Sequence, residues 1–600
     1  MSMTQQEQAT NLQENIHRED YDGRFNLQNL NHQTMIFARS RKRESLNGAW
    51  QFTPDLFDTG LRANWNVLEK QDSAGHSLPW DYDYQGGEWM PVPSCWNLFK
   101  PEYCFYEGSA WYCREFDYRE ATPGERLFLR VGAAHYDAKV FLNQEFLGNH
   151  YGGSTPFCVE LTGTAQPGRN ILQICVNNSR TADRVPMRNV DWFPYGGIYR
   201  DVELIRTPAH FIKDCFVYLV PDGTYRQIRA KIVVDDPAAR GEITFRIPEL
   251  ALETVQPFRD GCCEFTVEAQ PELWSPGHPK LYEVQAAYRD DRISDRVGFR
   301  QISVADRTIR CNGEKLFLRG VCVHEDDLQL GKATNEADIR RRFADAKELG
   351  CNFLRLTHYP HSELVAELAD EAGIMLWEEL PVYWAIDFAN PSTYRDAENQ
   401  LQELIRRDRN RCSVIIWSVG NENPDTDARL QFMGDLVKTA KTEDPSRLVS
   451  AACLVNPQAL RIEDRLAALL DVIGINEYYG WYRRDMGDLI QLGRNSNPDK
   501  PVIITETGAD ALAGYFDSGE ETLFSEDFMA RVYENQLAIL RKIDYIQGMT
   551  PWLLYDFRSP RRMNRFQQGF NRKGLIAEDK KTRKKAFYIL RDFYKEMSDE

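Results

Sequence analysis

The chain has 600 residues, of which 42% are hydrophobic and 27% charged, and its formal net charge is −17 at pH 7. This is the composition of an ordinary globular protein, so it excludes disordered and collagen-like classes. No apolar run approaches the ~18 residues that a membrane helix needs, and the negative charge disfavours nucleic acid or an anionic membrane as a partner.

Residues 1–20 are polar and carry no apolar segment of the kind found in secretory signals, so we expect a flexible tail. The thirteen cysteines are scattered, apart from Cys262 and Cys263, and form no CxxC pair. Such thiols are typical of a reducing compartment. The sequence therefore predicts a cytoplasmic protein.

Short apolar segments with period-two alternation follow the tail, separated by Gly, Pro and Asn. Residues 126–131, 138–142 and 170–176 are typical of strands, and they predict a β-sandwich over residues 21–206, of the jelly-roll sugar-binding type. Residues 216–220, 227–234 and 281–286 continue the pattern. We expect a separate, immunoglobulin-like β-sandwich over residues 207–304.

From residue 305 to 600, short apolar strands alternate with amphipathic helices, which predicts a catalytic (β/α)₈ TIM barrel. The eight expected strands are residues 316–322, 352–356, 374–377, 414–417, 448–451, 472–475, 502–505 and 549–554. Between the first two strands, Ile339, Phe343, Ala346 and Leu349 recur at helical spacing, and Gly350 is expected to end that helix. A second helix is expected from Ser362 to Gly373.

Polar and aromatic residues follow these strands, at the barrel end where active sites lie. They are His324, Arg355, Asn421, Glu422, Tyr478, Tyr482, Glu506 and Trp552. Such a set suits a sugar, which needs hydrogen bonds at its rim and stacking on its faces. We expect no cofactor and no catalytic metal.

Glu422 and Glu506 end the fourth and seventh strands, which face each other across a barrel. Glycosidic cleavage needs one protonated carboxyl to donate to the leaving oxygen and one ionised carboxylate to attack the anomeric carbon. For a single strand-end Glu, an ion pair with an Arg is the plain structural alternative. Two such residues together favour the catalytic interpretation.

Three segments resemble glycoside hydrolase family 2. They are residues 408–422, 352–360 and 505–510, and the expected domain order is that of the family. The resemblance implies that Glu422 is the acid/base and Glu506 the nucleophile of a retaining mechanism with a covalent intermediate. It also implies that Asn421 bonds the sugar 2-hydroxyl.

Asn571 and Lys573, after the eighth strand, resemble the Asn-x-Lys motif by which β-glucuronidases of this family hold the sugar carboxylate. An ammonium and an amide give charge-assisted bonds to a carboxylate, each worth roughly 1.5–3 kcal/mol. The alternative is that Lys573 belongs to a solvated basic surface that continues through the basic run at 580–585. The motif predicts an exo-acting β-uronidase whose partners are small-molecule or oligosaccharide β-uronides.

Further residues follow from the same resemblance. Tyr478 would support the nucleophile, and Tyr482, His324 and Trp552 would contact the sugar, although a metal ligand or a core histidine is the alternative for His324. Glu160 aligns with a residue that contacts the 4-hydroxyl. Because Glu160 is one methylene longer than the usual Asp, it predicts activity on β-galacturonides as well as, or instead of, β-glucuronides.

Two rival functions remain. One is a β-galactosidase of the same family, for which Lys573 would be incidental, and the other is a barrel that binds carbohydrate without chemistry.

The stretch from 378 to 411 leaves no room for a long loop over the site, which favours bulky or oligomeric leaving groups. A homodimer or tetramer is possible, because members of this family often oligomerise.

Overall fold

The computed structural model describes residues 25, 27–79, 82, 84, 86–517 and 522–599, so the expected tail at 1–20 lies outside the described residues. The chain forms two compact units. The first contains residues up to Ser179 together with Tyr195–Ala209, and the second contains Arg180–Pro194 and His210–Glu600. The short segment Arg180–Pro194 is therefore part of the second unit, although both of its flanks belong to the first.

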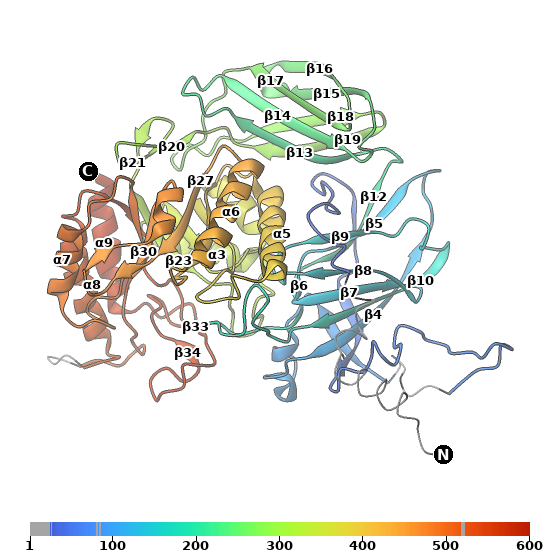
Figure 1. Ribbon diagram of the computed structural model, residues 1–600, viewed down its shortest axis with the longest axis horizontal. Helices are drawn as coiled ribbons and strands as arrows, with labels where there is room; N and C mark the ends of the chain where they lie inside the picture. The colour runs from blue at the N-terminus through green and yellow to red at the C-terminus, as the bar shows by residue number, and fades with distance from the viewer. Residues whose placement is uncertain are drawn as a thin grey trace. The chain divides into compact units, whose positions relative to one another are not determined.

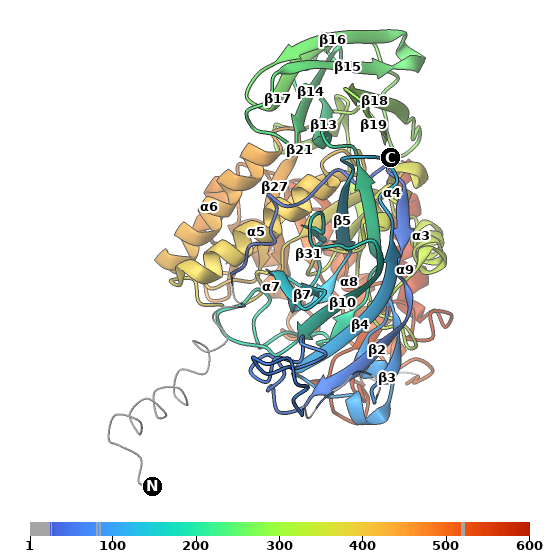
Figure 2. The same ribbon diagram turned by 90° about the vertical axis from the view of Figure 1, so that its right-hand side faces the viewer.

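The first unit is a β-sandwich of two antiparallel sheets, whose larger sheet is seen in Figure 2. In order across that sheet its strands are β3 (Glu88–Val92), β2 (Gly48–Asp55), β4 (Ser109–Tyr118), β10 (Gly168–Asn177), β7 (Asp137–Leu142) and β8 (Glu145–Tyr151). The second sheet contains β1 (Arg43–Ser45), β12 (Val202–Thr207), β5 (Arg126–Val131) and β9 (Phe157–Glu160). A short pair, β6 (Ala134–His135) and β11 (Gly197–Ile198), and two 3-10 turns, η2 (Trp96–Leu98) and η3 (Pro101–Tyr103), complete the unit. Alternate side chains of both sheets meet in one apolar core that includes Trp50, Tyr112 and Leu129, as the period-two pattern predicts.

The second unit begins with an immunoglobulin-like sandwich, which lies along the top of Figure 1. One sheet contains β13 (Ile212–Leu219), β14 (Gln227–Val234) and β17 (Cys262–Glu268). The other contains β16 (Leu252–Phe258), β15 (Gly241–Ile247), β18 (Tyr282–Tyr288) and β19 (Asp291–Val297), with the 3-10 turn η4 (Pro248–Leu250). A small sheet of β20 (Ile302–Ala305), β21 (Thr308–Cys311) and β22 (Glu314–Lys315) leads on to the barrel.

Eight parallel strands then close into a barrel, which confirms the predicted fold. They are β23 (Leu318–Val323), β24 (Phe353–Leu356), β25 (Met375–Glu379), β26 (Val414–Asn421), β27 (Leu448–Cys453), β30 (Ile473–Asn476), β31 (Val502–Glu506) and β32 (Ile546–Met549). Seven of the predicted strands overlap the observed ones closely. The eighth was placed too late, because residues 550–554 are apolar like a strand but continue beyond the barrel wall.

Helices and short extended segments connect the barrel strands, with helices packed around the outside (Figure 1). They are α3 (Glu336–Glu348), α4 (Glu363–Ala372), α5 (Pro391–Asp408), α6 (Asp427–Glu443), the pair β28 (Val455–Asn456) and β29 (Arg461–Ile462), η5 (Arg465–Leu469), α7 (Met486–Asn495), α8 (Glu526–Leu540), the pair β33 (Phe557–Arg558) and β34 (Phe570–Asn571), and α9 (Lys585–Asp599). The two predicted helices are α3 and α4. Gly350 and Gly373, which follow them, have the positive φ angles expected after a helix end, whereas Ser362 makes no side-chain capping bond.

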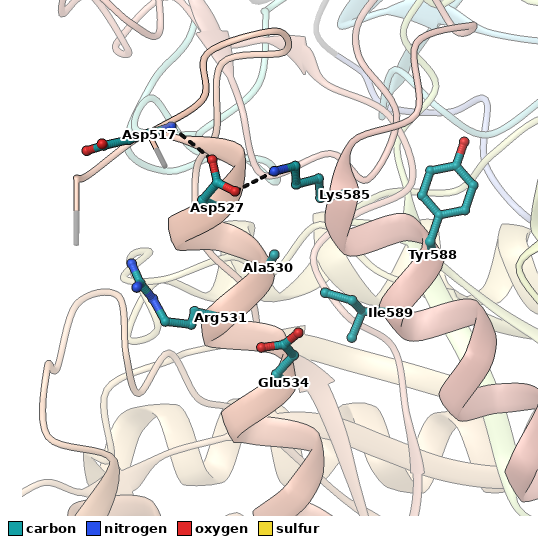
Figure 3. A pocket seen from close by; sticks show the side chains of 8 residues that line it. All are labelled: Asp517, Asp527, Ala530, Arg531, Glu534, Lys585, Tyr588 and Ile589. Atoms are coloured by element: carbon teal, nitrogen blue, oxygen red, sulfur yellow. Dashed lines mark hydrogen bonds and ion pairs between the residues drawn. The ribbon is translucent and has the colours of Figure 1, made fainter. Parts of the chain in front are cut away.

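All thirteen cysteines are free, and all except Cys104 and Cys262 are buried, as the sequence predicted. Among the described residues, no helix is both long enough and apolar enough to cross a membrane. A hollow of about 520 Å³ lies on the barrel surface between α8 and α9 (Figure 3). It is lined by side chains such as Glu534 and Tyr588 and contains none of the predicted site residues.

Candidate active site at the barrel mouth

Glu506 is the last residue of β31 and is almost fully buried. Its Oε1 accepts a hydrogen bond from Arg355 Nη1 at 2.9 Å, and its Oε2 accepts one from the Tyr478 hydroxyl at 2.7 Å. His358 Nε2 lies 3.7 Å from Oε1. Two donors, one from β24 and one from the segment after β30, therefore fix the position of this carboxylate.

Glu422 directly follows β26 and has a left-handed backbone, with a φ of 53°. A non-glycine residue in this region costs roughly 1–3 kcal/mol, and such strain is concentrated at functional sites. The amide of Glu422 donates to the Ala452 carbonyl at 3.0 Å, and its Oε2 accepts from Trp384 Nε1 at 2.8 Å. Burial, followed by the charge of Glu506, raises the pKa of Glu422 above its usual range. The two glutamates thus sit in different environments: Glu506 accepts bonds from a guanidinium and a phenol, and Glu422 is favoured as an acid.

Behind Glu506 lies a fully buried ion pair between Arg355 and Glu379. Burial alone would raise the pKa of Glu379, but Arg355 and then His358 outweigh it and lower the pKa to about 2. Because Glu379 is ionised, His358 donates to it through Nδ1, at 2.7 Å. Arg355 also donates to Asn421 Oδ1 at 2.8 Å. This geometry supports positioning of Glu506 and Asn421 by Arg355, rather than the direct sugar contact that the sequence suggested.

Asn421 and His324 present buried polar atoms toward the barrel mouth. Asn421 Oδ1 accepts from Arg355 and from Asn476, whereas its Nδ2 has no partner among the described residues. His324 Nδ1 lies 3.1 Å from the Tyr359 hydroxyl, and its Nε2 is likewise unpaired within the described chain. Such orphaned groups are costly unless a ligand satisfies them. Both are therefore suited to bind sugar hydroxyls.

Aromatic rings pack against the two histidines of this site, His324 and His358. Trp552 stacks on His358, with ring centroids 4.9 Å apart, and meets His324 edge to face at 5.2 Å. Burial and then His358 hold the pKa of His324 well below its usual range, so its ring is neutral. Among the described residues, no group of three or more His, Cys, Asp or Glu is arranged to hold a metal ion.

Asn571 and Lys573 lie in a second, more polar part of the site. Lys573 is buried, and its Nζ donates to Asp510 Oδ2 at 2.6 Å and to the Tyr482 hydroxyl at 3.1 Å. Burial alone would lower the pKa of Lys573, but Asp510 and Tyr482 raise it, so the ammonium is charged. Its burial excludes the alternative that Lys573 belongs to a solvated basic surface.

Two residues that sequence reasoning missed complete this cluster. Arg562 forms an ion pair with Asp191 and donates to the Tyr482 hydroxyl at 3.3 Å. Asn571 Nδ2 donates to Asp191 Oδ2 at 3.3 Å. Tyr482 as a whole residue is 58% exposed. Its hydroxyl lies between two cations, Lys573 and Arg562. We call Lys573, Arg562, Tyr482, Asn571 and Asp191 the cationic clamp.

Asp191 comes from the segment Arg180–Pro194, which the sequence analysis assigned only to the end of the first sandwich. Its neighbour Trp192 packs against His358 at a centroid distance of 5.8 Å and against Tyr383 at 5.1 Å. The signal available in the sequence was an acidic residue beside a Trp in a loop rich in aromatics and glycine. Nothing local, however, indicates which distant strands such a loop approaches.

Glu160, by contrast, lies at the end of β9 in the first unit. Arg126 Nε and Nη2 donate to its two oxygens, both at 2.7 Å. This bidentate ion pair gives Glu160 a structural role within its own sheet. The geometry thus offers no support for a sugar contact by Glu160.

The basic run near the C-terminus is neutralised within the protein. Lys584 is fully buried and donates to both oxygens of Asp556, at 2.8 and 2.9 Å, and Arg583 forms an ion pair with Asp345. Lys580 pairs with Asp327. Lys580, Arg583 and Lys584 are therefore held by ion pairs within the protein, and they do not form the solvated basic surface that was the alternative.

A (β/α)₈ barrel with two carboxylates of opposite character at its mouth is the architecture of a glycoside hydrolase. Three family models match the chain: the sugar binding domain of glycosyl hydrolases family 2 over residues 43–208, a second domain of that family over 212–300, and its TIM barrel domain over 302–598. The chain belongs to glycosyl hydrolase family 2.

Relatives and solved structures resemble nearly the whole chain. A β-glucuronidase from Paenibacillus borealis is 27% identical, over 94% of this chain and 99% of its own. The structure of a β-glucuronidase from an uncultured Clostridium species has a TM-score of 0.81 at 27% identity, covering 94% of this chain and 99% of that one. A β-galacturonidase from Eisenbergiella tayi, bound to galacturonate, has a TM-score of 0.79 at 27% identity with the same coverage.

Proposed function

We propose that this protein is a retaining, exo-acting β-uronidase that removes one terminal uronic acid through a covalent glycosyl-enzyme intermediate. The observation that carries the proposal is the cationic clamp, in which the exposed Tyr482 hydroxyl receives bonds from both Lys573 and Arg562. Two cations that converge on one hydroxyl can both donate charge-assisted hydrogen bonds to a carboxylate, whereas the hydroxymethyl group of a neutral sugar offers them no charge to bind.

The chemistry uses the two glutamates in turn. The Glu506 carboxylate attacks the anomeric carbon while the Glu422 carboxyl protonates the departing glycosidic oxygen, which frees the leaving group. Glu422, now ionised, takes a proton from water, and the resulting hydroxide displaces Glu506 from the anomeric carbon. Two inversions give net retention.

The surrounding residues have separate tasks in this scheme. Tyr478 and Arg355 hold Glu506 in its attacking position, and Asn421 Nδ2 is free to bond the 2-hydroxyl. His324 Nε2 and the Trp552 ring line the sugar site. Asp191 supplies an acidic acceptor within the clamp.

Relatives named for both uronic acids support the substrate class without choosing the epimer. A panel of nitrophenyl β-glucuronide, galacturonide, galactoside and mannoside tests the proposal directly. We expect hydrolysis of at least one uronide, with kcat/KM at least tenfold above either neutral glycoside. Faster hydrolysis of the galactoside would favour the β-galactosidase alternative, and binding without hydrolysis would favour the non-enzymatic one. A strong preference for glucuronide would contradict the expectation of a dual-epimer enzyme.

The clamp itself is tested most cleanly with Tyr482→Phe, because this exposed residue can lose its hydroxyl without unpairing Asp510. We expect kcat/KM for the uronide to fall roughly ten- to a hundredfold, the value of one or two charge-assisted bonds. Lys573→Gln should be combined with Asp510→Asn, because a buried carboxylate left alone costs several kcal/mol. Unchanged uronide kinetics in both variants would exclude the clamp.

The cytoplasmic location and an oligomeric state stay predictions from the sequence.

A further inference from the structure

Arg561 lies in the loop between β33 and β34, and its guanidinium sits over the ring of Trp384, 4.9 Å from the ring centroid. The side chain is exposed. Within the described parts of the chain it has no hydrogen bond and no ion pair. By comparison, Arg562 in the same loop is bound to Asp191. Arg561 is thus a stacked cation whose charge is not neutralised by the protein.

Trp384 is held in place by the residues around the acid/base. Its indole donates to Glu422 Oε2 at 2.8 Å, and its amide donates to the Asn421 carbonyl at 2.9 Å. Its own carbonyl accepts from Asn423 Nδ2 at 2.7 Å. Its φ of 54° places it in the left-handed region, a strained geometry that its surroundings must hold. The ring position, and with it that of Arg561, is therefore coupled to Glu422.

The loop that carries Arg561 is anchored on both sides of it. Ser559 Oγ donates to Asp191 Oδ1 at 2.7 Å, and Arg562 Nε donates to the same oxygen at 3.1 Å. Upstream, the amide of Arg558 donates to Asp326 Oδ2 at 3.0 Å. An exposed arginine on a free loop loses much conformational entropy when it binds a ligand. An arginine that is stacked on a ring and carried by an anchored loop loses less.

Glu422 protonates the glycosidic oxygen, so the leaving group lies beside it. We propose that Arg561 binds the carboxylate of a second uronic acid, which makes acidic oligosaccharides the substrate class from which one uronic acid is removed at a time. This inference rests on the proposed function. The alternative is a surface arginine that merely shields the Trp384 ring.

The test compares two disaccharides with the same terminal uronic acid and the same β-linkage, one with glucose and one with glucuronic acid as the leaving sugar. The readout is the ratio of their kcat/KM values, measured from the disappearance of each disaccharide. We expect the wild type to prefer the acidic leaving sugar roughly three- to tenfold, since one exposed ion pair contributes little more. Raising NaCl to about 0.5 M should reduce the preference, because salt screens exposed charges.

Arg561→Gln should bring this ratio close to one, and Arg561→Lys should retain part of the preference because it keeps the charge. Arg565→Gln is the matched control: Arg565 is exposed on the same loop and stacks on Phe566 at 4.7 Å, away from Glu422. We expect this control to keep the wild-type ratio.

A wild-type ratio near one, a ratio unchanged by Arg561→Gln, or an equal fall in Arg565→Gln would overturn the inference. The same holds if nitrophenyl uronide is hydrolysed but neither disaccharide is, and in that case the proposed function survives. If no uronide of any kind is hydrolysed, the proposed function fails and this inference fails with it.

Discussion

At the scale of single residues, the site separates two chemically identical side chains by their neighbours. Glu506 receives a guanidinium and a phenol, whereas Glu422 receives one indole N–H and faces the negative charge of Glu506. The neighbours therefore separate the two roles: burial and the charge of Glu506 raise the pKa of Glu422, as a general acid requires. The indole of Trp384 works against this separation, because a donor to the carboxylate favours its charged form.

Replacing Trp384 with Phe removes that donor while keeping an aromatic ring. The pKa of Glu422 should rise, since burial and Glu506 raise it and one of the hydrogen bonds that oppose them is lost. Because Glu422 must be protonated to act as an acid, the alkaline limb of the kcat/KM profile should move to higher pH. The profile is measured with nitrophenyl uronide, and Trp481→Phe is the aromatic control. A shift toward lower pH, or none, would contradict this account.

At the scale of elements, the clamp depends on how closely residues 571–574 approach the turn before β33. Gly574 donates to Asp556 Oδ1 at 2.8 Å. A Cβ at Gly574 would lie 2.2 Å from the Asp556 nitrogen and 2.6 Å from the Tyr555 carbonyl carbon. Backbone atoms cannot yield as a flexible side chain can, so only glycine fits here.

Gly574→Ala should push the Asn571–Lys573 segment away from the turn. We expect a loss of about 1–3 kcal/mol in the free energy of unfolding from overpacking, and a fall of at least tenfold in uronide kcat/KM. Gly277→Ala, where nothing lies within 4 Å of the added carbon, is the control. Thermal unfolding and kinetics measured on both variants decide the matter. A Gly574→Ala protein with wild-type kinetics would show that the clamp tolerates displacement.

At the scale of the whole molecule, the segment 408–422, which ends at Glu422, also binds the immunoglobulin-like sandwich to the barrel. Asn410 Oδ1 accepts from the Val217 amide at 2.9 Å, and its Nδ2 donates to the Cys215 carbonyl at 2.9 Å. Arg409 and Arg411 form ion pairs with Asp214 and Asp295 of that sandwich. These signature residues are therefore structural rather than catalytic.

Asn410→Ala leaves two buried backbone groups of the sandwich unsatisfied. We expect a loss of about 1–3 kcal/mol in unfolding free energy and faster amide exchange in β13, with uronide kcat/KM within about twofold of wild type. Arg229→Gln, which removes an exposed ion pair within the sandwich, should change neither quantity. If the amides of β13 exchanged as slowly in Asn410→Ala as in the wild type, contacts other than those of Asn410 would hold the sandwich to the barrel.

Much of this organisation could be predicted from the sequence, because periodicity is a local signal. Seven barrel strands and the positions of Glu422 and Glu506 at strand ends follow from it directly. The eighth strand was misplaced because residues 550–554 are apolar for a different reason: they pack beneath the site, with Leu553 and Leu554 fully buried. Arg562 and Asp191 are 371 positions apart in the chain, and no local pattern encodes that pairing.

The discontinuous second unit has a consequence for dividing the polypeptide. The barrel and its neighbouring sandwich span one continuous stretch from residue 210 onward, yet Asp191 and Trp192 reach them from an earlier excursion of the chain. A gene fragment that begins at residue 210 would encode both glutamates but leave Arg562 without its carboxylate and His358 without the neighbouring ring of Trp192. A fragment that retains the complete site thus needs the segment Arg180–Pro194 as well as the barrel's own sequence.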